Sequence, residues 1–356
     1  MNADDHMKSL KELLLEQTRV GDLWHPEPGD AVRCVACGHR CFIPENFDGV
    51  CKVRTNRGGE LRVPFGYVSG LQVDPIEKKP FFHVLPGAQA LSFGMLGCDF
   101  RCRYCQNWFS SQALRDPQAS SQPMAMSVEE IITTAIGMKA KVLTSTYNEP
   151  LITSEWAVEI FKRGKASGLH TCYVSNGNGT PEVLEYIRPF TDYYKIDLKS
   201  FRDKRYRELG GVLANVKDTI VRVFEMGFWL EIVTLIIPDF NDDPSELKEL
   251  CEFIAAVSPD IPWHATAFHS DYKMIATEDT GTQTLLRAAE IAGNAGLRYV
   301  YLGNRMGQVG NWENTYCHGC RALLVERRGF HILQNRVSMA GTCPDCQRVI
   351  PGRWSG

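Results

Sequence analysis

The sequence predicts an α/β fold: a partial or nearly complete TIM-type barrel, preceded by a four-cysteine segment and followed by a zinc ribbon. Two observations lead to this prediction. Between about residues 88 and 305, seven short apolar segments alternate with amphipathic segments of helical period. Of the 13 cysteines, eleven fall into three groups at metal-ligand spacing. Repeated βα units imply parallel strands with right-handed crossovers. Seven strands fit a barrel better than a doubly wound sheet, although periodicity alone does not close the barrel.

The seven expected strands are 90–96, 141–146, 171–175, 193–198, 230–237, 263–268 and 297–302. Ser127 and Glu130 form a capping box, because each side chain can bond the backbone of the other at a helix start. Glycines mark the ends of helices before the next strand, at Gly168, Gly227 and Gly296. The helices are expected to begin near Ser127, Ser154, Pro181, Asn215, Pro244 and Thr282.

The chain divides into five expected parts: a helical lead (1–30), a four-cysteine metal module (31–62), a connecting segment (63–88), the barrel (89–306) and a zinc-ribbon module (307–356). The first 17 residues carry a leucine stripe among charged residues and are expected to form a short amphipathic helix. Residues 74–80 are interpreted as a linker that packs the following Phe81, Phe82 and His83 onto the barrel. A lid or a partner-docking segment is the alternative.

The composition gives no support to some classes of partner. A net charge of −3 over 356 residues gives no electrostatic reason to expect nucleic acid or an anionic membrane as the main partner. The N-terminus lacks the basic start and long apolar core of a signal peptide. No run approaches the roughly 18 apolar residues that span a bilayer. We therefore expect a soluble, cytoplasmic protein whose thiols stay reduced.

The central cysteines have the spacing C-x3-C-x2-C, at Cys98, Cys102 and Cys105, directly after an apolar strand. Three thiolates hold three corners of a [4Fe-4S] cluster and leave the fourth iron open to a small chelating ligand, whereas a closed electron-transfer cluster normally takes four. Zinc favours paired CxxC or CxxH ligands, and no fourth ligand stands at such spacing here. The spacing therefore predicts a cluster that takes part in chemistry.

The other cysteines form two sets of four. The first set suits either a structural zinc, which we favour, or a second iron-sulfur centre, and His39 is a possible substitute ligand. The second set consists of two CxxC pairs separated by 22 residues, the pattern of a zinc ribbon. Cys172 and Cys251 lie outside the groups and are interpreted as buried small hydrophobes. The sets are Cys34, Cys37, Cys41 and Cys51, and Cys317, Cys320, Cys343 and Cys346.

Polar side chains follow most of the expected strands. In a TIM-type barrel the carboxyl ends of the strands line the active site, so these residues become its candidates. Each has a plain structural interpretation when taken alone, as a turn pair, a solvated edge or a helix start. The candidates are Glu149 after the second strand, Asn176 after the third, Asp197 and Lys199 at the fourth, and His269 after the sixth.

Together these motifs resemble the radical S-adenosylmethionine (SAM) enzymes related to pyruvate formate-lyase activating enzyme. A closer resemblance, over nearly the whole chain, is to the radical SAM protein of the AmmeMemoRadiSam system. It rests on the N-terminal four-cysteine segment, the terminal CxxC pairs and three short stretches: Asp-Pro-Ile-Glu-Lys-Lys-Pro at 74–80, Cys-Gln-Asn at 105–107 and Phe-His-Ser-Asp-Tyr-Lys-Met at 268–274. The broader resemblance rests on the central cysteines and on Tyr-Asn-Glu-Pro at 147–150, Ser-Asn-Gly at 175–177 and Asp-Leu-Lys at 197–199.

The resemblance implies that the central cysteines hold a [4Fe-4S] cluster and that SAM chelates its open iron. SAM needs an acceptor for its ammonium, a cation for its carboxylate and hydrogen bonds to its ribose. Glu149 is expected to meet the first need, Lys199 the second, and Asn176 and Asp197 the third. Tyr104 is expected beside the adenine. His269 is interpreted as a catalytic acid or base, with a SAM contact or a core histidine as alternatives.

One departure from the activating enzymes concerns the second strand, where they usually carry Gly-Gly-Glu-Pro. Tyr147 and Asn148 take the place of the two glycines here, and their side chains narrow the pocket. Glu149 keeps its position, but an activating-enzyme substrate is less well supported.

The expected function follows from the resemblance. An external one-electron donor such as flavodoxin or ferredoxin reduces the cluster, SAM is cleaved to a 5'-deoxyadenosyl radical, and that radical removes hydrogen from an unidentified protein or small molecule. The alternative from another class is a zinc-dependent protein that binds protein or nucleic acid and has a non-catalytic barrel. That alternative explains the two four-cysteine sets but not Cys98, Cys102 and Cys105.

Overall fold

The computed structural model describes residues 8–355, and its centre is one curved sheet. Within that range the sheet has eight strands in the order β16-β15-β14-β13-β12-β11-β9-β8. All neighbours from β9 to β16 pair in parallel, and β8 pairs antiparallel with β9. The strands are β8 (Gly70–Pro75), β9 (Gln89–Gly94), β11 (Val142–Ser145), β12 (His170–Ser175), β13 (Tyr193–Asp197), β14 (Trp229–Ile236), β15 (Trp263–Ala267) and β16 (Val300–Gly303).

The sheet is an open barrel, because β16 and β8 lie at its two ends and are not paired with each other. This confirms the predicted partial TIM-type barrel and all seven predicted strands. The sequence did not predict β8, whose partly exposed residues include Gly70, Asp74 and Pro75 and show neither alternation nor an apolar run. The strand lies in the stretch interpreted as a connecting segment, and it extends the sheet.

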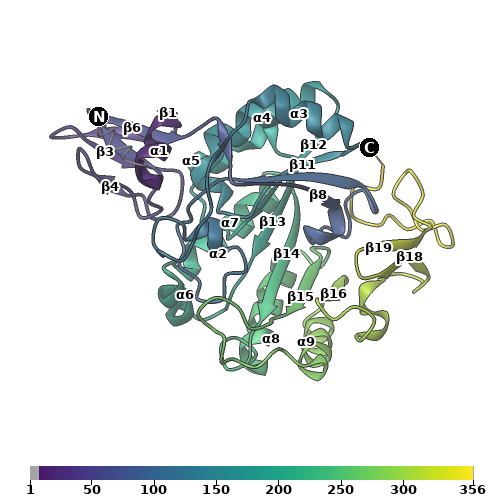
Figure 1. The fold of residues 1–356 in the computed structure, drawn as a ribbon. Helices are drawn as coiled ribbons and strands as arrows, with labels where there is room; N and C mark the ends of the chain where they lie inside the picture. The colour runs from purple at the N-terminus through teal and green to yellow at the C-terminus, as the bar shows by residue number, and fades with distance from the viewer. Residues whose placement is uncertain (1–7, 356) are drawn as a thin grey trace.

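Helices follow the parallel strands and cover the outside of the sheet, with α3 and α4 along one side and α8 and α9 along the other (Figure 1). The six predicted helices are present, and the capping box is formed, since Ser127 N–H donates to Glu130 at 2.7 Å and Glu130 N–H donates to the Ser127 hydroxyl at 3.2 Å. The short α2 (Trp108–Ser111) and α6 (Asp203–Leu209) were not predicted. The six are α3 (Val128–Gly137), α4 (Ser154–Ala166), α5 (Pro181–Ile187), α7 (Leu213–Glu225), α8 (Pro244–Val257) and α9 (Thr282–Asn294).

The packing follows the sequence pattern. Each residue of β11 is buried, as expected for a strand covered on both faces. Helix α9 buries Leu285, Ala288, Ala289 and Ala292, which are spaced to form one face of a helix. A fully buried leucine side chain contributes about 1.5–3 kcal/mol, so one continuous core of such residues holds sheet and helices together. No helix within residues 8–355 is both long and apolar enough to cross a bilayer.

One small unit precedes the barrel along the chain, and another follows it. The N-terminal unit begins with a short helix that falls in the predicted amphipathic segment, of which residues 1–7 lie outside the described range. The C-terminal unit is a three-stranded antiparallel sheet on the opposite side of the molecule (Figure 1). The N-terminal elements are α1 (Leu10–Glu16), β1 (Thr18–Val20), β2 (Trp24–Glu27), β3 (Ala31–Cys34), β4 (Phe42–Ile43), β5 (Thr55–Arg57), β6 (Glu60–Pro64) and β7 (Tyr67–Val68), which pairs with β10 (Met124–Ala125); the C-terminal ones are β17 (Thr315–Tyr316), β18 (Leu323–Arg328) and β19 (His331–Asn335).

Residues just before β9 join the C-terminal unit to the barrel. Phe81, Phe82 and His83 are buried, as the linker interpretation expects. Arg327 of β18 donates to the Phe82 carbonyl at 2.6 Å, and its guanidinium lies 4.4 Å from the centre of the Phe82 ring. His83 Nδ1 lies 2.6 Å from the Pro351 carbonyl.

The short 3-10 helices are η1 (Ile76–Lys78), η2 (Pro150–Thr153), η3 (Arg188–Phe190) and η4 (Gly310–Glu313).

A buried ion pair joins the N-terminal unit to helix α4. Arg54 donates to both carboxylate oxygens of Glu155, at 2.7 and 2.8 Å, and both side chains are 1% exposed. Burial acts to raise the pKa of Glu155, but Arg54 holds it below its ordinary value. Glu155 also accepts from the backbone N–H groups of Asp22 and Leu23. The pair is therefore fully hydrogen-bonded, which a buried charge requires.

We predict that Glu155→Ala lowers the free energy of unfolding by about 3–5 kcal/mol, because it leaves the Arg54 charge buried and unpaired. The matched control is Glu159→Ala, one turn later on α4, whose partner Lys162 is half exposed. An exposed pair of that kind contributes about 0–1 kcal/mol. Urea unfolding followed by circular dichroism measures both losses. Equal losses for the two variants would contradict the role given to the buried pair.

Candidate functional site

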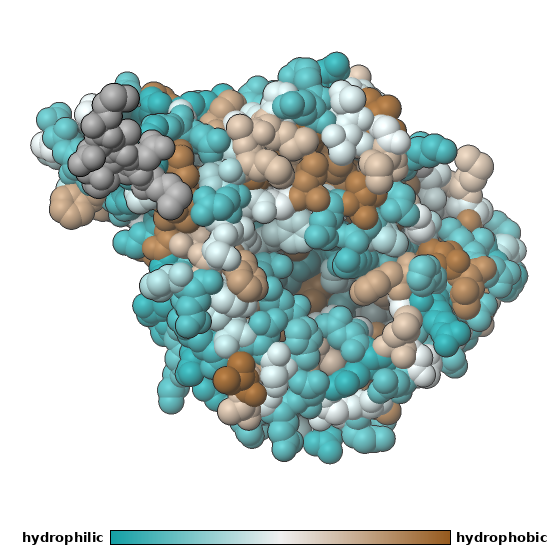
Figure 2. All heavy atoms as spheres, in the orientation of Figure 1, coloured by the Kyte–Doolittle hydropathy of each residue, from teal (hydrophilic) through white to brown (hydrophobic). Residues whose placement is uncertain are grey.

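A cavity of about 430 Å³ opens at the carboxyl ends of the barrel strands. Figure 2 shows the hollow near the centre of one face of the molecule. Strand ends supply one part of its wall, and the loop that follows β9 supplies another. This is the rim that the barrel fold assigns to an active site. The strand-end residues are Thr146, Asp197, Lys199, Leu235, Thr266 and Asn304, and the loop contributes Cys102, Tyr104 and Cys105.

The three central cysteines lie in this loop. Cys102 is buried, and Cys98 and Cys105 are half-buried. The backbone N–H of Phe100 donates to the Cys98 sulfur at 3.4 Å, and the Ser111 hydroxyl lies 3.2 Å from the Cys105 sulfur. Within the described residues the three sulfurs are not all within 4.8 Å of one another, so they do not form a compact single-ion site.

Burial determines the protonation of these thiols. It raises the pKa of Cys102 to about 12, and it also raises the pKa values of Cys98 and Cys105. Without a cation the thiols would therefore stay protonated at neutral pH. Iron binding converts buried cysteines into thiolates, so the donor set fits a group that carries its own positive charge.

A buried carboxylate fixes the loop to the barrel. Asp99, which is 2% exposed, accepts from the side-chain amides of Asn176 at 2.7 Å and Asn178 at 2.8 Å. Both amides belong to the loop after β12. Because Asp99 directly follows Cys98, these bonds hold the first cysteine of the trio in place. Neither Asp99 nor Asn178 is among the predicted site residues, since an Asp between two motif cysteines has no spacing signal of its own.

Two predicted residues, Glu149 and Asn176, belong to this buried network and not to the cavity wall. Glu149 accepts from the Ser175 hydroxyl at 2.7 Å, the Asn176 N–H at 2.8 Å and the Leu151 N–H at 3.2 Å. Burial raises the pKa of Glu149 to about 8, and the nearby Asp99 charge acts in the same direction. The oxygens of Glu149 are thus occupied by protein donors.

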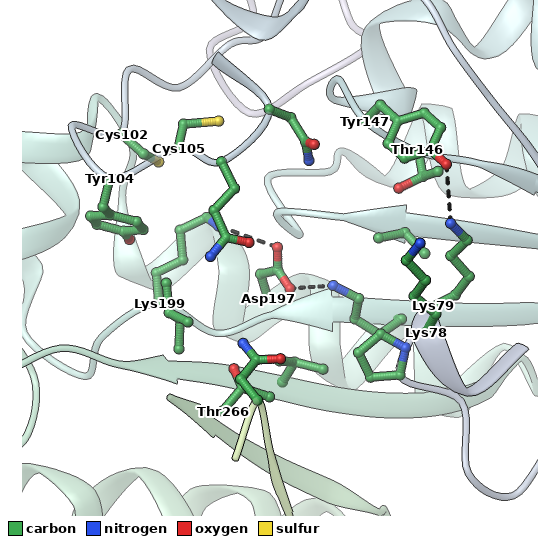
Figure 3. Close-up of a pocket in the computed structure, with 18 of the residues that line it drawn as sticks. Lys78, Lys79, Cys102, Tyr104, Cys105, Thr146, Tyr147, Asp197, Lys199 and Thr266 are labelled. Carbon is green, nitrogen blue, oxygen red and sulfur yellow. Dashed lines mark hydrogen bonds and ion pairs between the residues drawn. The ribbon is translucent and has the colours of Figure 1, made fainter. Parts of the chain in front are cut away.

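A chain of charges runs along the end of β13, on the cavity wall. Asp197 bonds Lys195 through one oxygen and accepts from Lys199 at 3.3 Å through the other (Figure 3). Burial acts to raise the pKa of Asp197, but the two ammonium groups lower it to about 2. One carboxylate therefore balances two lysines, and this part of the wall carries an excess positive charge.

The opposite wall comes from η1, from Lys79 directly after it and from the loop that follows β11. Lys79 donates to the Tyr147 hydroxyl at 3.1 Å and to Asp74 at 3.1 Å, and Lys78 donates to Asp74 at 2.7 Å. Figure 3 shows Lys78 and Lys79 across the cavity from Cys102 and Cys105. Tyr147 has a φ of 71°, an unfavourable conformation for an aromatic residue. Phe330 of the C-terminal unit completes the wall.

The remaining predicted residues lie at the edge of the cavity. Tyr104 lines it, with its ring 5.7 Å from that of Phe240. His269 is exposed, and its Nε2 lies 2.8 Å from the side-chain nitrogen of Gln106, which lines the cavity. His269 itself does not line the cavity. Lys78, Lys79 and Phe330 were not among the predicted site residues, and only the family-like motif at 74–80 could have indicated the two lysines.

The four cysteines of the C-terminal unit lie close together. The sulfurs of Cys317, Cys320, Cys343 and Cys346 all lie within 4.8 Å of one another, with Cys317 and Cys346 3.6 Å apart. In tetrahedral zinc sites a Zn–S bond of about 2.3 Å places the sulfurs about 3.8 Å apart. The C-terminal set is therefore a four-cysteine site of single-ion size, as a zinc ribbon requires.

The sequence matches a known family over residues 94–254, which include all three central cysteines. That family is described as the radical SAM superfamily. A relative from Methanocaldococcus jannaschii, described as uncharacterized protein MJ0808, is 36% identical over 302 residues, which cover 84% of this chain and 89% of the relative.

The chain belongs to the radical SAM superfamily.

The chain is also similar to pyruvate formate-lyase activating enzymes. The pyruvate formate-lyase 1-activating enzyme of Escherichia coli is 24% identical over 238 residues, 61% of this chain and 93% of that enzyme. A solved domain of the pyruvate-formate lyase-activating enzyme from Bacteroides vulgatus covers 45% of this chain and 98% of its own, with 22% identity and a TM-score of 0.41. The radical SAM family implies a [4Fe-4S] cluster, SAM and an external reductant. The thiols that open onto the cavity suit that cofactor set.

Proposed function

We propose that this protein is a radical SAM oxidoreductase whose cluster is held by Cys98, Cys102 and Cys105 and whose substrate binds in the adjoining cavity. The observation that carries the proposal is that Cys102 and Cys105 line an open cavity together with Lys199 and Asp197. Three thiolates beside open space leave one iron accessible to a ligand. When bound, the cluster supplies the electron that cleaves SAM into methionine and a 5'-deoxyadenosyl radical.

The residues of the wall have distinct proposed roles. Lys199 pairs with the carboxylate of SAM, and Asp197 orients Lys199 and accepts from a ribose hydroxyl. Tyr104 packs against the adenine. Apolar side chains of the strands, Val174, Val233 and Leu235, line the same cavity and limit the access of water to it.

Glu149 and Asn176 are proposed as positioning residues. Their hydrogen bonds point to Ser175, Leu151 and Asp99, so they support the cluster loop from behind. His269 is proposed as an acid or base at the mouth of the cavity, next to Gln106. The similarity to activating enzymes supports a glycyl residue of a partner protein as one substrate class, and a small molecule is the other. Flavodoxin or ferredoxin is the proposed donor.

The central test follows 5'-deoxyadenosine. Anaerobically reconstituted protein with dithionite and SAM is expected to release 5'-deoxyadenosine, and Cys102→Ala is expected to reduce that release by at least about a thousandfold, because two thiolates do not hold the cluster. Cys251→Ala is the control, since this buried cysteine of α8 lies outside the three groups. Chromatography of the products measures the yield. Normal turnover by Cys102→Ala would refute the assignment.

A second prediction concerns Lys199. Lys199→Met is expected to weaken SAM binding about tenfold, equivalent to about 1.4 kcal/mol, because a charge-assisted bond to the SAM carboxylate is lost. Lys248→Met, on the exposed face of α8, is the matched control. Isothermal titration with SAM under anaerobic conditions measures both affinities. Equal affinities in Lys199→Met and wild type would remove Lys199 from the SAM site.

A further inference from the structure

The N-terminal cysteines differ from the zinc-sized set in how far apart their sulfurs lie. All four residues are within the described range, yet no three of the donor atoms of Cys34, Cys37, Cys41 and Cys51 come within 4.8 Å of one another, with or without His39. The C-terminal set meets that condition, and the catalytic trio does not. In an iron-sulfur cluster the thiolates bind different irons, so their sulfurs spread more widely than around one ion.

The surroundings of the N-terminal set also differ from those of the ribbon. Cys34, Cys37 and Cys51 are buried and Cys41 is half-buried, whereas Cys320 and Cys346 of the ribbon are exposed. The buried Arg54 donates from Nε to the Cys34 sulfur at 3.2 Å, and the Val50 N–H donates to the Cys41 sulfur at 3.5 Å. Burial and hydrogen bonds to sulfur are among the features that set the reduction potential of a cluster.

The N-terminal set lies directly against the catalytic loop. Gly97, the residue before Cys98, faces Cys51: a Cβ on Gly97 would lie 2.9 Å from the Cys51 carbonyl oxygen and 2.8 Å from the Val53 side chain. The Gly38 N–H, next to Cys37, donates to the Asn178 carbonyl at 2.8 Å. The side chain of Asn178 in turn donates to Asp99, the neighbour of Cys98. Two short contact paths therefore connect the two groups of thiols.

We propose that Cys34, Cys37, Cys41 and Cys51 hold a closed iron-sulfur cluster, in place of the structural zinc expected above, and that this cluster relays electrons to the one at Cys98, Cys102 and Cys105. Each relay step moves one electron: the external donor protein is oxidised by one electron as the N-terminal cluster is reduced, and the N-terminal cluster is reoxidised as the catalytic cluster is reduced. The identity of the metal does not depend on the proposed function, whereas the relay does.

The decisive variant is Cys98→Ala/Cys102→Ala/Cys105→Ala, because it removes the catalytic ligands and leaves the N-terminal set intact. After anaerobic reconstitution and desalting, we expect about two to four irons and about one zinc per chain, and a reduced protein whose electron paramagnetic resonance (EPR) signal does not change with SAM. Iron below about 0.5 per chain with about two zincs would overturn the proposal. This result is independent of whether the wild type cleaves SAM.

A second variant, Cys34→Ala/Cys37→Ala, tests the relay. Relative to wild type, we expect this variant to lose as much iron as the first variant retains. It should still show an EPR signal that changes when SAM is added. With the small reductant dithionite the release of 5'-deoxyadenosine should stay within about threefold of wild type, and with reduced flavodoxin it should fall at least tenfold. An unchanged flavodoxin-driven rate would contradict the relay.

Wild-type protein provides a further measurement if the second variant does not fold. The loops that carry the two groups of cysteines are in contact, so two reduced clusters held by them should interact magnetically. The EPR spectrum of the fully reduced wild type should therefore be broader than that of the first variant. A wild-type spectrum without that broadening would contradict the placement of a second cluster beside the catalytic loop.

Discussion

The site depends on one buried carboxylate. Asp99 accepts two amide hydrogen bonds from the loop after β12, and it directly follows Cys98, the first of the three central cysteines. A carboxyl group removed from water must be hydrogen-bonded to be tolerated, so the bonds that hold Asp99 in place also hold the adjacent Cys98. Through Asn178 the same interaction reaches Gly38 of the N-terminal unit. The loop that carries Cys98, Cys102 and Cys105, the barrel and the N-terminal cysteines are thus held in one arrangement.

Charge gives the cavity its polarity. Lys195 and Lys199 share Asp197 on one wall, and Lys78 and Lys79 share Asp74 on the other. Each wall therefore carries one more ammonium than carboxylate. Coulomb interactions are strong in a partly dehydrated cavity, so an anionic group between the walls would be stabilised. The carboxylate of SAM is one such group, and the same property would attract an acidic substrate.

Local patterns predict most of the fold. The seven parallel strands are short apolar runs separated by helices with recognisable caps, so β9 and β11–β16 could be placed from the sequence. Strand β8 could not be placed in this way. Its partly exposed residues show neither the two-residue alternation of a strand nor an apolar run, and the strand forms because it pairs with β9. The trio at Cys98, Cys102 and Cys105 could be singled out because three cysteines at metal-ligand spacing lie within eight residues.

For the polar residues at the strand ends, the direction of the side chain was less predictable than the position of the residue in the fold. The polar strand ends do meet at one rim, but sequence does not show whether Glu149 points to the cavity or to Ser175 and Asn176 behind it. The contact between Lys79 and Tyr147 joins residues 68 positions apart, and Phe330 comes from the far end of the chain. Such contacts follow from packing between distant segments, which leaves no local signal. The metal of the N-terminal set was likewise undecided by spacing and is addressed by sulfur geometry.

The central claim is that the trio leaves one iron free for SAM. Electron-nuclear double resonance of the reduced protein with SAM labelled by nitrogen-15 at its amino group, or by oxygen-17 at its carboxylate, tests this claim most directly. The account predicts hyperfine coupling between the cluster and both labels. SAM that binds to the reduced protein without coupling from either label would show that SAM does not chelate the cluster, and the radical chemistry proposed here would have no starting point.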